Sequence, residues 1–172
     1  MASLKLEGRL WVLERNGELI GDIDTDMIFH NQYLAITDVN RMGQYSFDNL
    51  EGFKNFAELA EPGDMILAGD NFGSGSSRQQ AVDCFISLGV TAVIARSYGA
   101  IYKRNAINSA FPVITMPTAR AEYFSHMETV LLDMEEGTLG GRPVEPVSGV
   151  QKEIYLAGGL FQYAESLDQA EE

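Results

Sequence analysis

The chain has 172 residues, of which 45% are hydrophobic, so it is long enough to bury one core and short for two. Its 12 basic and 25 acidic residues give a formal net charge of −13, which argues against nucleic acid or an anionic membrane as a partner. No apolar run is long enough to span a membrane and no signal peptide is recognisable, so we expect a cytoplasmic protein. We expect one domain over residues 1–172, with an acidic, frayed tail at residues 168–172.

The first third of the chain predicts one strand and a long irregular region. Residues 4–13 are apolar enough for a strand region, which Gly8 is expected to break. Residues 27–34 predict a short helix or turn. Residues 37–55 mix polar, aromatic and glycine residues without a steady period, which indicates a mobile or loosely helical segment.

A βαβ unit follows in the middle of the chain. Residues 65–68 form a short apolar strand, and a glycine-rich loop runs from Gly69 to Gln80. Apolar residues then recur at helical spacing until Gly89, which predicts a helix with a glycine cap. Residues 91–95 predict a second strand. Two strands joined by one helix favour parallel pairing with a right-handed crossover.

The rest of the chain continues the alternation of helices and strands. The fold class that we predict is α/β, a single domain with a mixed, largely parallel sheet flanked by helices. In chain order the pattern predicts a helix over 97–110, a strand over 112–116, a helix over 118–127, and strands over 130–134, 144–147 and 154–156.

The glycine loop is the main candidate for chemistry. It places two serines and Arg78 just before a helix, where unpaired backbone N–H groups and the helix dipole favour anions. The guanidinium of Arg78 suits a carboxylate. The loop has neither the lysine of a phosphate-binding loop nor a serine flanked as in a nucleophile elbow. The alternative interpretation is a plain turn, in which Ser77 and Gln80 form a capping box.

No metal site is predicted in this chain. The single cysteine, Cys84, lies on the apolar stripe of the predicted helix and is expected in the core. One cysteine holds neither an iron–sulfur cluster nor a structural zinc. The two histidines, His30 and His126, share no motif, and we assign neither a catalytic role.

Four separated motifs together resemble a known family. They are Ile23 to Ile28 with Tyr33-Leu34, Gly73 to Arg78, Ala95 to Tyr98 leading into Arg104 to Asn108, and Ala157 to Leu160. Their order and spacing are similar to the 3-isopropylmalate dehydratase small subunits, the detached swivelling domain of the aconitase superfamily. The resemblance covers nearly all of residues 8–164.

The resemblance implies a hydro-lyase in leucine biosynthesis that isomerises 2-isopropylmalate and 3-isopropylmalate by dehydration and rehydration. It implies that a large partner subunit carries a [4Fe–4S] cluster, and that this chain carries no cofactor of its own. The small subunit would close the active site and supply the base. The substrate would be a small hydroxy-dicarboxylic acid.

The resemblance also implies roles for individual residues. Ser76 would be the catalytic base, acting as an alkoxide stabilised by the helix N-terminus and Arg78. Ser77 and Arg78 would bind a substrate carboxylate. Asp26 would be catalytic, by orienting groups of the other domain, and Thr25 would bind substrate. The alternative is that Asp24 and Asp26 only cap a turn.

Substrate choice is predicted from the segment after Tyr33-Leu34. Ala35 and Ile36 stand where relatives that act on tricarboxylic homologues carry an arginine, which favours an alkyl branch over a carboxylate. A dimethylmalate or citraconate dehydratase is an alternative on the same residues. A homoaconitase-type enzyme is an alternative if Arg41 reaches the pocket. A non-enzymatic carboxylate-binding module is the alternative from another class.

Overall fold

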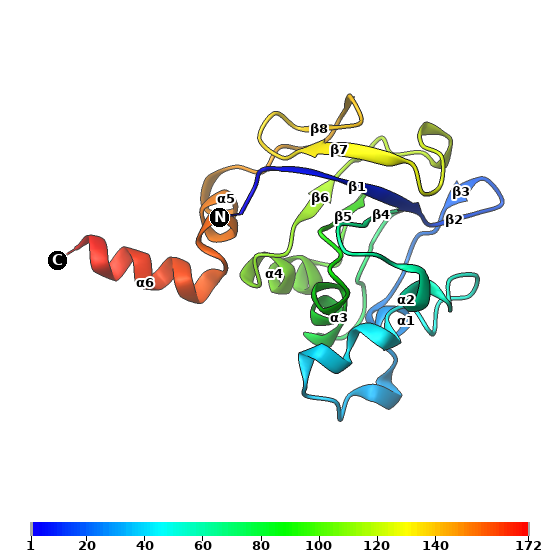
Figure 1. The fold of residues 1–172 in the computed structure, drawn as a ribbon, viewed down its shortest axis with the longest axis horizontal. Helices are drawn as coiled ribbons and strands as arrows, with labels where there is room; N and C mark the ends of the chain where they lie inside the picture. The colour runs from blue at the N-terminus through cyan, green and yellow to red at the C-terminus, as the bar shows by residue number, and fades with distance from the viewer. Residues whose placement is uncertain (1, 172) are drawn as a thin grey trace.

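A seven-stranded sheet with the order β6-β5-β4-β1-β7-β8-β9 forms the centre of the computed structural model, which describes residues 2–171 (Figure 1). A separate hairpin is formed by β2 and β3. The strands are β1 (Lys5–Val12), β2 (Glu14–Arg15), β3 (Glu18–Leu19), β4 (Met65–Ala68), β5 (Ala92–Ala95), β6 (Val113–Thr115), β7 (Thr129–Asp133), β8 (Thr138–Leu139) and β9 (Arg142–Pro143). The helices are α1 (Thr25–Ile28), α2 (Phe56–Leu59), α3 (Gln80–Leu88), α4 (Ala100–Asn108), α5 (Gly149–Ala157) and α6 (Leu160–Ala170), with 3-10 turns η1 (Asn31–Tyr33), η2 (Val39–Arg41), η3 (Gly43–Tyr45) and η4 (Ala121–Tyr123).

The sheet is mixed, as predicted. Strands β1, β4, β5 and β6 pair in parallel, and β7 joins β1 antiparallel, followed by β8 and β9. The predicted βαβ unit is confirmed as β4-α3-β5, and Gly89 caps α3 in the left-handed conformation. The α/β fold class is therefore confirmed.

Alternating side chains of the central strands divide the core into two clusters. On β1, Trp11 faces a cluster built with α3 and α4, whereas Leu10 and Val12 face a second cluster with β7 and β8. Helices α3 and α4 lie on one side of β1, β4 and β5, and the antiparallel strands curl across the other (Figure 1). The period of two along each buried strand produces both faces.

Gly8 does not break the first strand, contrary to our prediction. Strand β1 is continuous from Lys5 to Val12. A Cβ atom on Gly8 would lie 1.9 Å from the carbonyl oxygen of Gly63. The glycine therefore permits a close approach of two backbones within a regular strand.

The predicted helix over residues 118–127 is wrong. Only η4 and turns occur there. The backbone is bound to other elements instead: Arg96 Nε donates to the carbonyl of Ala119 at 2.7 Å, and Met127 N donates to the carbonyl of Leu10 at 2.8 Å. These tertiary bonds outweigh the local helical pattern.

Three predictions for the C-terminal part also differ from the structure. The predicted strand over 144–147 is wrong, because the last strand pair is formed by β8 and β9. The predicted strand over 154–156 is wrong, because it lies within α5, on which Ile154 is buried. Helix α6 continues to Ala170 and projects from the body, so residues 168–170 are helical in place of the expected frayed tail (Figure 1). Glu172 lies outside the described residues.

The segment 37–55 is folded against α3 as a series of turns. The 3-10 turns η2 and η3 pack on α3, which confirms the loosely helical part of the prediction. Phe47 is fully buried and packs edge to face against Phe85 of α3, with ring centroids 5.1 Å apart. Tyr45 stacks on Tyr33 with ring centroids 3.9 Å apart. Aromatic packing therefore holds this irregular segment beside the helix that follows the glycine loop.

Candidate functional site

The glycine loop lies where the sequence predicted it, between the carboxyl end of β4 and the start of α3. Gly73 has a φ of +76°, and a Cβ atom there would lie 2.2 Å from Cγ of Tyr102. Its N–H donates to the carbonyl of Ile23 at 2.7 Å. The loop is thus wedged between α4 and the segment that leads into α1. Carboxyl ends of parallel strands are the usual ligand sites of open α/β sheets.

The loop presents exposed hydroxyls and unpaired backbone donors. Ser76 and Ser77 are exposed. Within residues 2–171, the N–H groups of residues 75–80 donate no hydrogen bond. The predicted capping box is absent, because Gln79 caps α3 without a side-chain bond and Ser77 Oγ instead accepts from Asn105 Nδ2 at 3.4 Å. Such a run of free N–H groups at a helix start is suited to an anion.

Thr25 holds the backbone of the glycine loop at Ser74 and Ser76. Thr25 is 3% exposed, and its Oγ1 donates to the carbonyl of Ser76 at 3.0 Å. Its N–H donates to the carbonyl of Ser74 at 2.9 Å. The hydroxyl of Thr25, which we predicted to bind substrate, is bonded to the loop backbone in this structure. Its bonds set the position of Ser76.

Arg78 is tied to α1. Its Nη1 lies 3.1 Å from Asp26 Oδ1 and also donates to the carbonyls of Phe29 at 2.7 Å and Thr25 at 3.4 Å. The Arg78 side chain is 10% exposed and that of Asp26 is 39% exposed. Within residues 2–171, Arg78 makes no hydrogen bond to Ser76 Oγ. Nε and Nη2 of Arg78 have no partner within the same residues.

Asp26 is held as an ionised acceptor. Its Oδ1 accepts from Asn31 N at 2.8 Å, and its Oδ2 accepts from Asn49 Nδ2 at 3.2 Å. Partial burial opposes ionisation, but the bonds from Asn31 N and Arg78 and the charge of Arg78 outweigh it and lower the pKa of Asp26. Asn49 also donates to the Asp26 carbonyl at 3.2 Å.

The two aspartates of this segment have different roles. Asp24 caps α1 by accepting from Met27 N at 2.9 Å. The capping alternative therefore describes Asp24, whereas Asp26 links α1 to Arg78 and Asn49. Sequence reasoning missed Asn49, because nothing in its local pattern marks a partner 23 residues away.

The predicted specificity residues lie beyond η1. Ala35 is exposed, whereas Ile36 is half-buried and packs against the core cluster of α3. Arg41 is exposed at the end of η2. None of the three makes a hydrogen bond to the glycine loop within residues 2–171. The structure therefore leaves Ala35 available to a ligand and commits part of Ile36 to packing.

The side chains of this chain do not fit an iron–sulfur cluster. Cys84 is fully buried on α3, and burial raises the pKa of its thiol to about 12, so it stays protonated. Its predicted core position is confirmed. Within residues 2–171, no three histidine, cysteine, aspartate or glutamate side chains are grouped to hold a metal ion. Over the same part of the chain, no helix has the length and hydropathy to cross a membrane.

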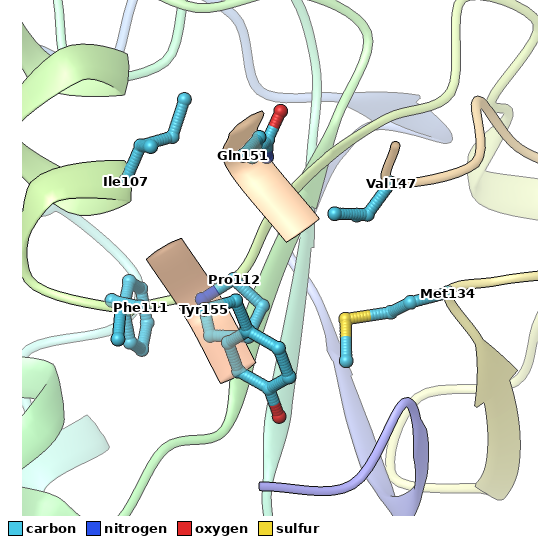
Figure 2. A pocket seen from close by; sticks show the side chains of 8 residues that line it. Ile107, Phe111, Pro112, Met134, Val147, Gln151 and Tyr155 are labelled. Carbon is cyan, nitrogen blue, oxygen red and sulfur yellow. The ribbon is translucent and has the colours of Figure 1, made fainter. Parts of the chain in front are cut away.

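A small, mostly apolar pocket lies elsewhere, between α4, α5 and the end of β7. Figure 2 shows Phe111, Met134 and Tyr155 around it. Its volume of about 10 Å³ is close to that of one water-sized probe. It is too small for a hydroxy acid and carries none of the loop residues.

Comparison with known proteins gives a consistent result. Residues 22–119 match the aconitase C-terminal domain. The 3-isopropylmalate dehydratase small subunit 1 of Archaeoglobus fulgidus is 37% identical over 153 residues, which cover 85% of this chain and 92% of that protein. The small subunit of Sulfolobus acidocaldarius is 37% identical over 158 residues, covering 88% and 96%.

A solved structure agrees with these relatives. The crystal structure of 3-isopropylmalate dehydratase from Methanocaldococcus jannaschii matches with a TM-score of 0.83 and 31% identity, over 97% of each chain. The resemblance that four motifs predicted is confirmed. The chain belongs to the aconitase C-terminal domain family and, within it, to the 3-isopropylmalate dehydratase small subunits.

Proposed function

We propose that this chain is the small subunit of a hydro-lyase that interconverts 2-isopropylmalate and 3-isopropylmalate by dehydration and rehydration, in leucine biosynthesis. The observation that supports the site most strongly is the exposed Ser76-Ser77 loop with free N–H groups over residues 75–80. A substrate carboxylate accepts from these N–H groups, and Arg78 adds charge through the nitrogens that Asp26 leaves free.

Ser76 is the proposed base. It removes the proton beside a carboxylate, while the substrate hydroxyl leaves from the adjacent carbon. A serine alkoxide is a strong base that needs stabilisation, and the positive end of α3 with its unpaired N–H groups supplies it. Thr25 supports this role by holding the Ser76 carbonyl at 3.0 Å.

Asp26 and Ser77 complete the proposed site. The Asp26 carboxylate stays ionised, and its ion pair with Arg78 sets the orientation of the Arg78 guanidinium. Ser77 Oγ is exposed and contributes to carboxylate binding. Thr25 acts through the loop, not through the substrate.

The partner is proposed to be a large subunit that carries a [4Fe–4S] cluster. Expulsion of hydroxide needs a Lewis acid. The one thiol of this chain is buried and protonated, so it is not available as a cluster ligand, which supports a cluster in the partner. We also propose that the pair works in the cytoplasm, where a single reduced cysteine is ordinary.

Reconstitution tests the proposed function. We expect the purified chain to contain no stoichiometric iron and to have no turnover, and we expect the pair formed with the large subunit from the same organism to convert 2-isopropylmalate to its isomer. An active isolated chain, or an inactive pair whose cluster content is complete, would contradict the proposal. A panel that includes dimethylmalate, citraconate and homoaconitate distinguishes the alternatives.

A further inference from the structure

His30 borders the Asp26–Arg78 ion pair. The carbonyl of the residue before it, Phe29, accepts from Arg78 Nη1 at 2.7 Å. The N–H of the residue after it, Asn31, donates to Asp26 Oδ1 at 2.8 Å. His30 therefore lies between the two residues whose backbone groups bind the ion pair. The sequence alone gave His30 no role.

One nitrogen of the imidazole is fixed by the backbone. His30 Nδ1 accepts from Gln32 N at 3.0 Å, so the proton of the neutral ring resides on Nε2. His30 is half-buried, and within residues 2–171 its Nε2 has no partner. The side chain is therefore held in one orientation with one unused donor.

A further hydrogen-bond donor would favour the binding of an anionic substrate at this site. Asp26 neutralises part of the charge of Arg78, and the whole chain has a net charge of −13. A dianionic substrate therefore approaches an unfavourable overall field. Of the two histidines, only His30 adjoins the pair, because His126 accepts from Val12 N and lies edge to face against Trp11 of β1.

We propose that His30 is a substrate-binding residue, whose Nε2–H donates a hydrogen bond to a carboxylate oxygen of the hydroxy-acid substrate. The inference rests on the proposed function, because it takes its ligand from that reaction. The competing explanation is that His30 only caps η1 through Nδ1.

Two substitutions of His30 distinguish the role of its Nε2–H donor from the role of its Nδ1 cap. In His30→Asn, the amide oxygen replaces Nδ1 as an acceptor for Gln32 N, and the distal donor is lost. In His30→Gln, the amide nitrogen replaces Nε2 as a donor, and the cap is lost. A capping role predicts that the Asn variant is normal and the Gln variant is impaired. A substrate-binding role predicts the reverse for substrate affinity.

The experiment measures KM and kcat for 2-isopropylmalate with the reconstituted pair, and thermal unfolding of each small subunit. We expect His30→Asn to raise KM about tenfold to a hundredfold without a change in the unfolding midpoint, as for loss of a hydrogen bond to a charged group. We expect His30→Gln to keep KM within about threefold of wild type, with a lower midpoint.

Contrary outcomes are distinct. An unchanged KM in His30→Asn, or equal losses in both variants, would overturn the role of His30 while the wild-type activity upholds the proposed function. A fully loaded wild-type pair that turns over no hydroxy acid would overturn the proposed function and the inference with it.

Discussion

The two ends of β4 carry the same kind of ion pair in opposite settings. At its amino end, Asp64 is 2% exposed and accepts from Arg9 Nε at 2.9 Å, Arg9 Nη2 at 2.8 Å and Trp11 Nε1 at 2.8 Å. At its carboxyl end, Asp26 is 39% exposed and shares Arg78 with two carbonyls.

The difference lies in what is left unpaired. The carboxylate of Asp64 also accepts from Glu61 N at 2.9 Å, so its surroundings are closed. Around Arg78, two guanidinium nitrogens and the N–H groups of residues 75–80 lack partners within residues 2–171. Satisfied polar groups stabilise a fold, whereas preorganised unsatisfied ones at a surface bind a ligand. We therefore expect substitutions at the amino end to change stability and those at the carboxyl end to change activity.

Ser76→Ala has the largest expected effect. Loss of the base should lower kcat of the reconstituted pair by about 10²–10⁴-fold. Folding and subunit association should stay close to wild type, because Ser76 Oγ has no hydrogen-bond partner within residues 2–171. Ser77→Ala is the matched control and should affect KM at least as much as kcat. Near-normal kcat in Ser76→Ala would end the assignment of the base.

Asp64→Asn is expected to act on stability alone. It removes the charge that the Arg9 guanidinium and the Trp11 indole contact, and the free energy of unfolding should fall by about 3 kcal/mol in a urea titration. Asp26→Asn, the matched change at the other end, should lose less stability because Asp26 is more exposed, and should lower kcat/KM. If Asp26→Asn were the less stable variant and kept full activity, the comparison would be reversed.

Ala35→Arg extends the comparison to the segment beyond η1. The wild-type pair should prefer an alkyl branch, because an unpaired carboxylate loses its hydration against apolar side chains. A new guanidinium should shift the ratio of kcat/KM for isopropylmalate over homoaconitate about tenfold toward the tricarboxylate. A wild-type pair that prefers the tricarboxylate would indicate that Arg41 or another cation reaches the ligand.

Acid should lower the stability of the fold by protonating Asp64 at the amino end of β4. Burial raises its pKa, but the bonds from Arg9, Glu61 N and Trp11 outweigh burial and hold the pKa below the ordinary 3.8. A carboxylate whose pKa is lower in the folded state stabilises the fold at pH values above its unfolded-state pKa. This contribution is lost as the pH falls through the folded-state pKa. Urea titrations should therefore show that the free energy of unfolding falls less between about pH 7 and about pH 3 in Asp64→Asn than in wild type. Equal losses in both would exclude Asp64 as a source of acid sensitivity.

The sequence predicted those parts of the molecule whose signals are local. Strand β4, helix α3 and its Gly89 cap follow from continuous apolar periods, and the glycine loop between them is marked by composition. The helix proposed over 118–127 failed because Arg96 and β1 bind its backbone from elsewhere in the chain.

The site was predictable in its residues and less so in their contacts. Ser76, Ser77 and Arg78 are all on the loop, yet the partners of Arg78 lie on α1 and the carbonyl after it. Thr25 was recognised as part of the site, but its burial behind Ser76 depends on a long-range bond. The positions of Asn49 and His30 beside Asp26 depend on the path of the chain through η1 and η3, which no local pattern specifies.

A structure of the reconstituted pair with a bound isopropylmalate analogue tests the central claim most directly. The claim is that the carboxyl end of β4 holds the substrate. We expect a carboxylate of the analogue on the N–H groups of residues 75–80, with Ser76 Oγ at about 3 Å from the hydrogen-bearing carbon. An analogue that contacts none of residues 75–80, with Arg78 still bound only to Asp26 and the α1 segment, would contradict the account.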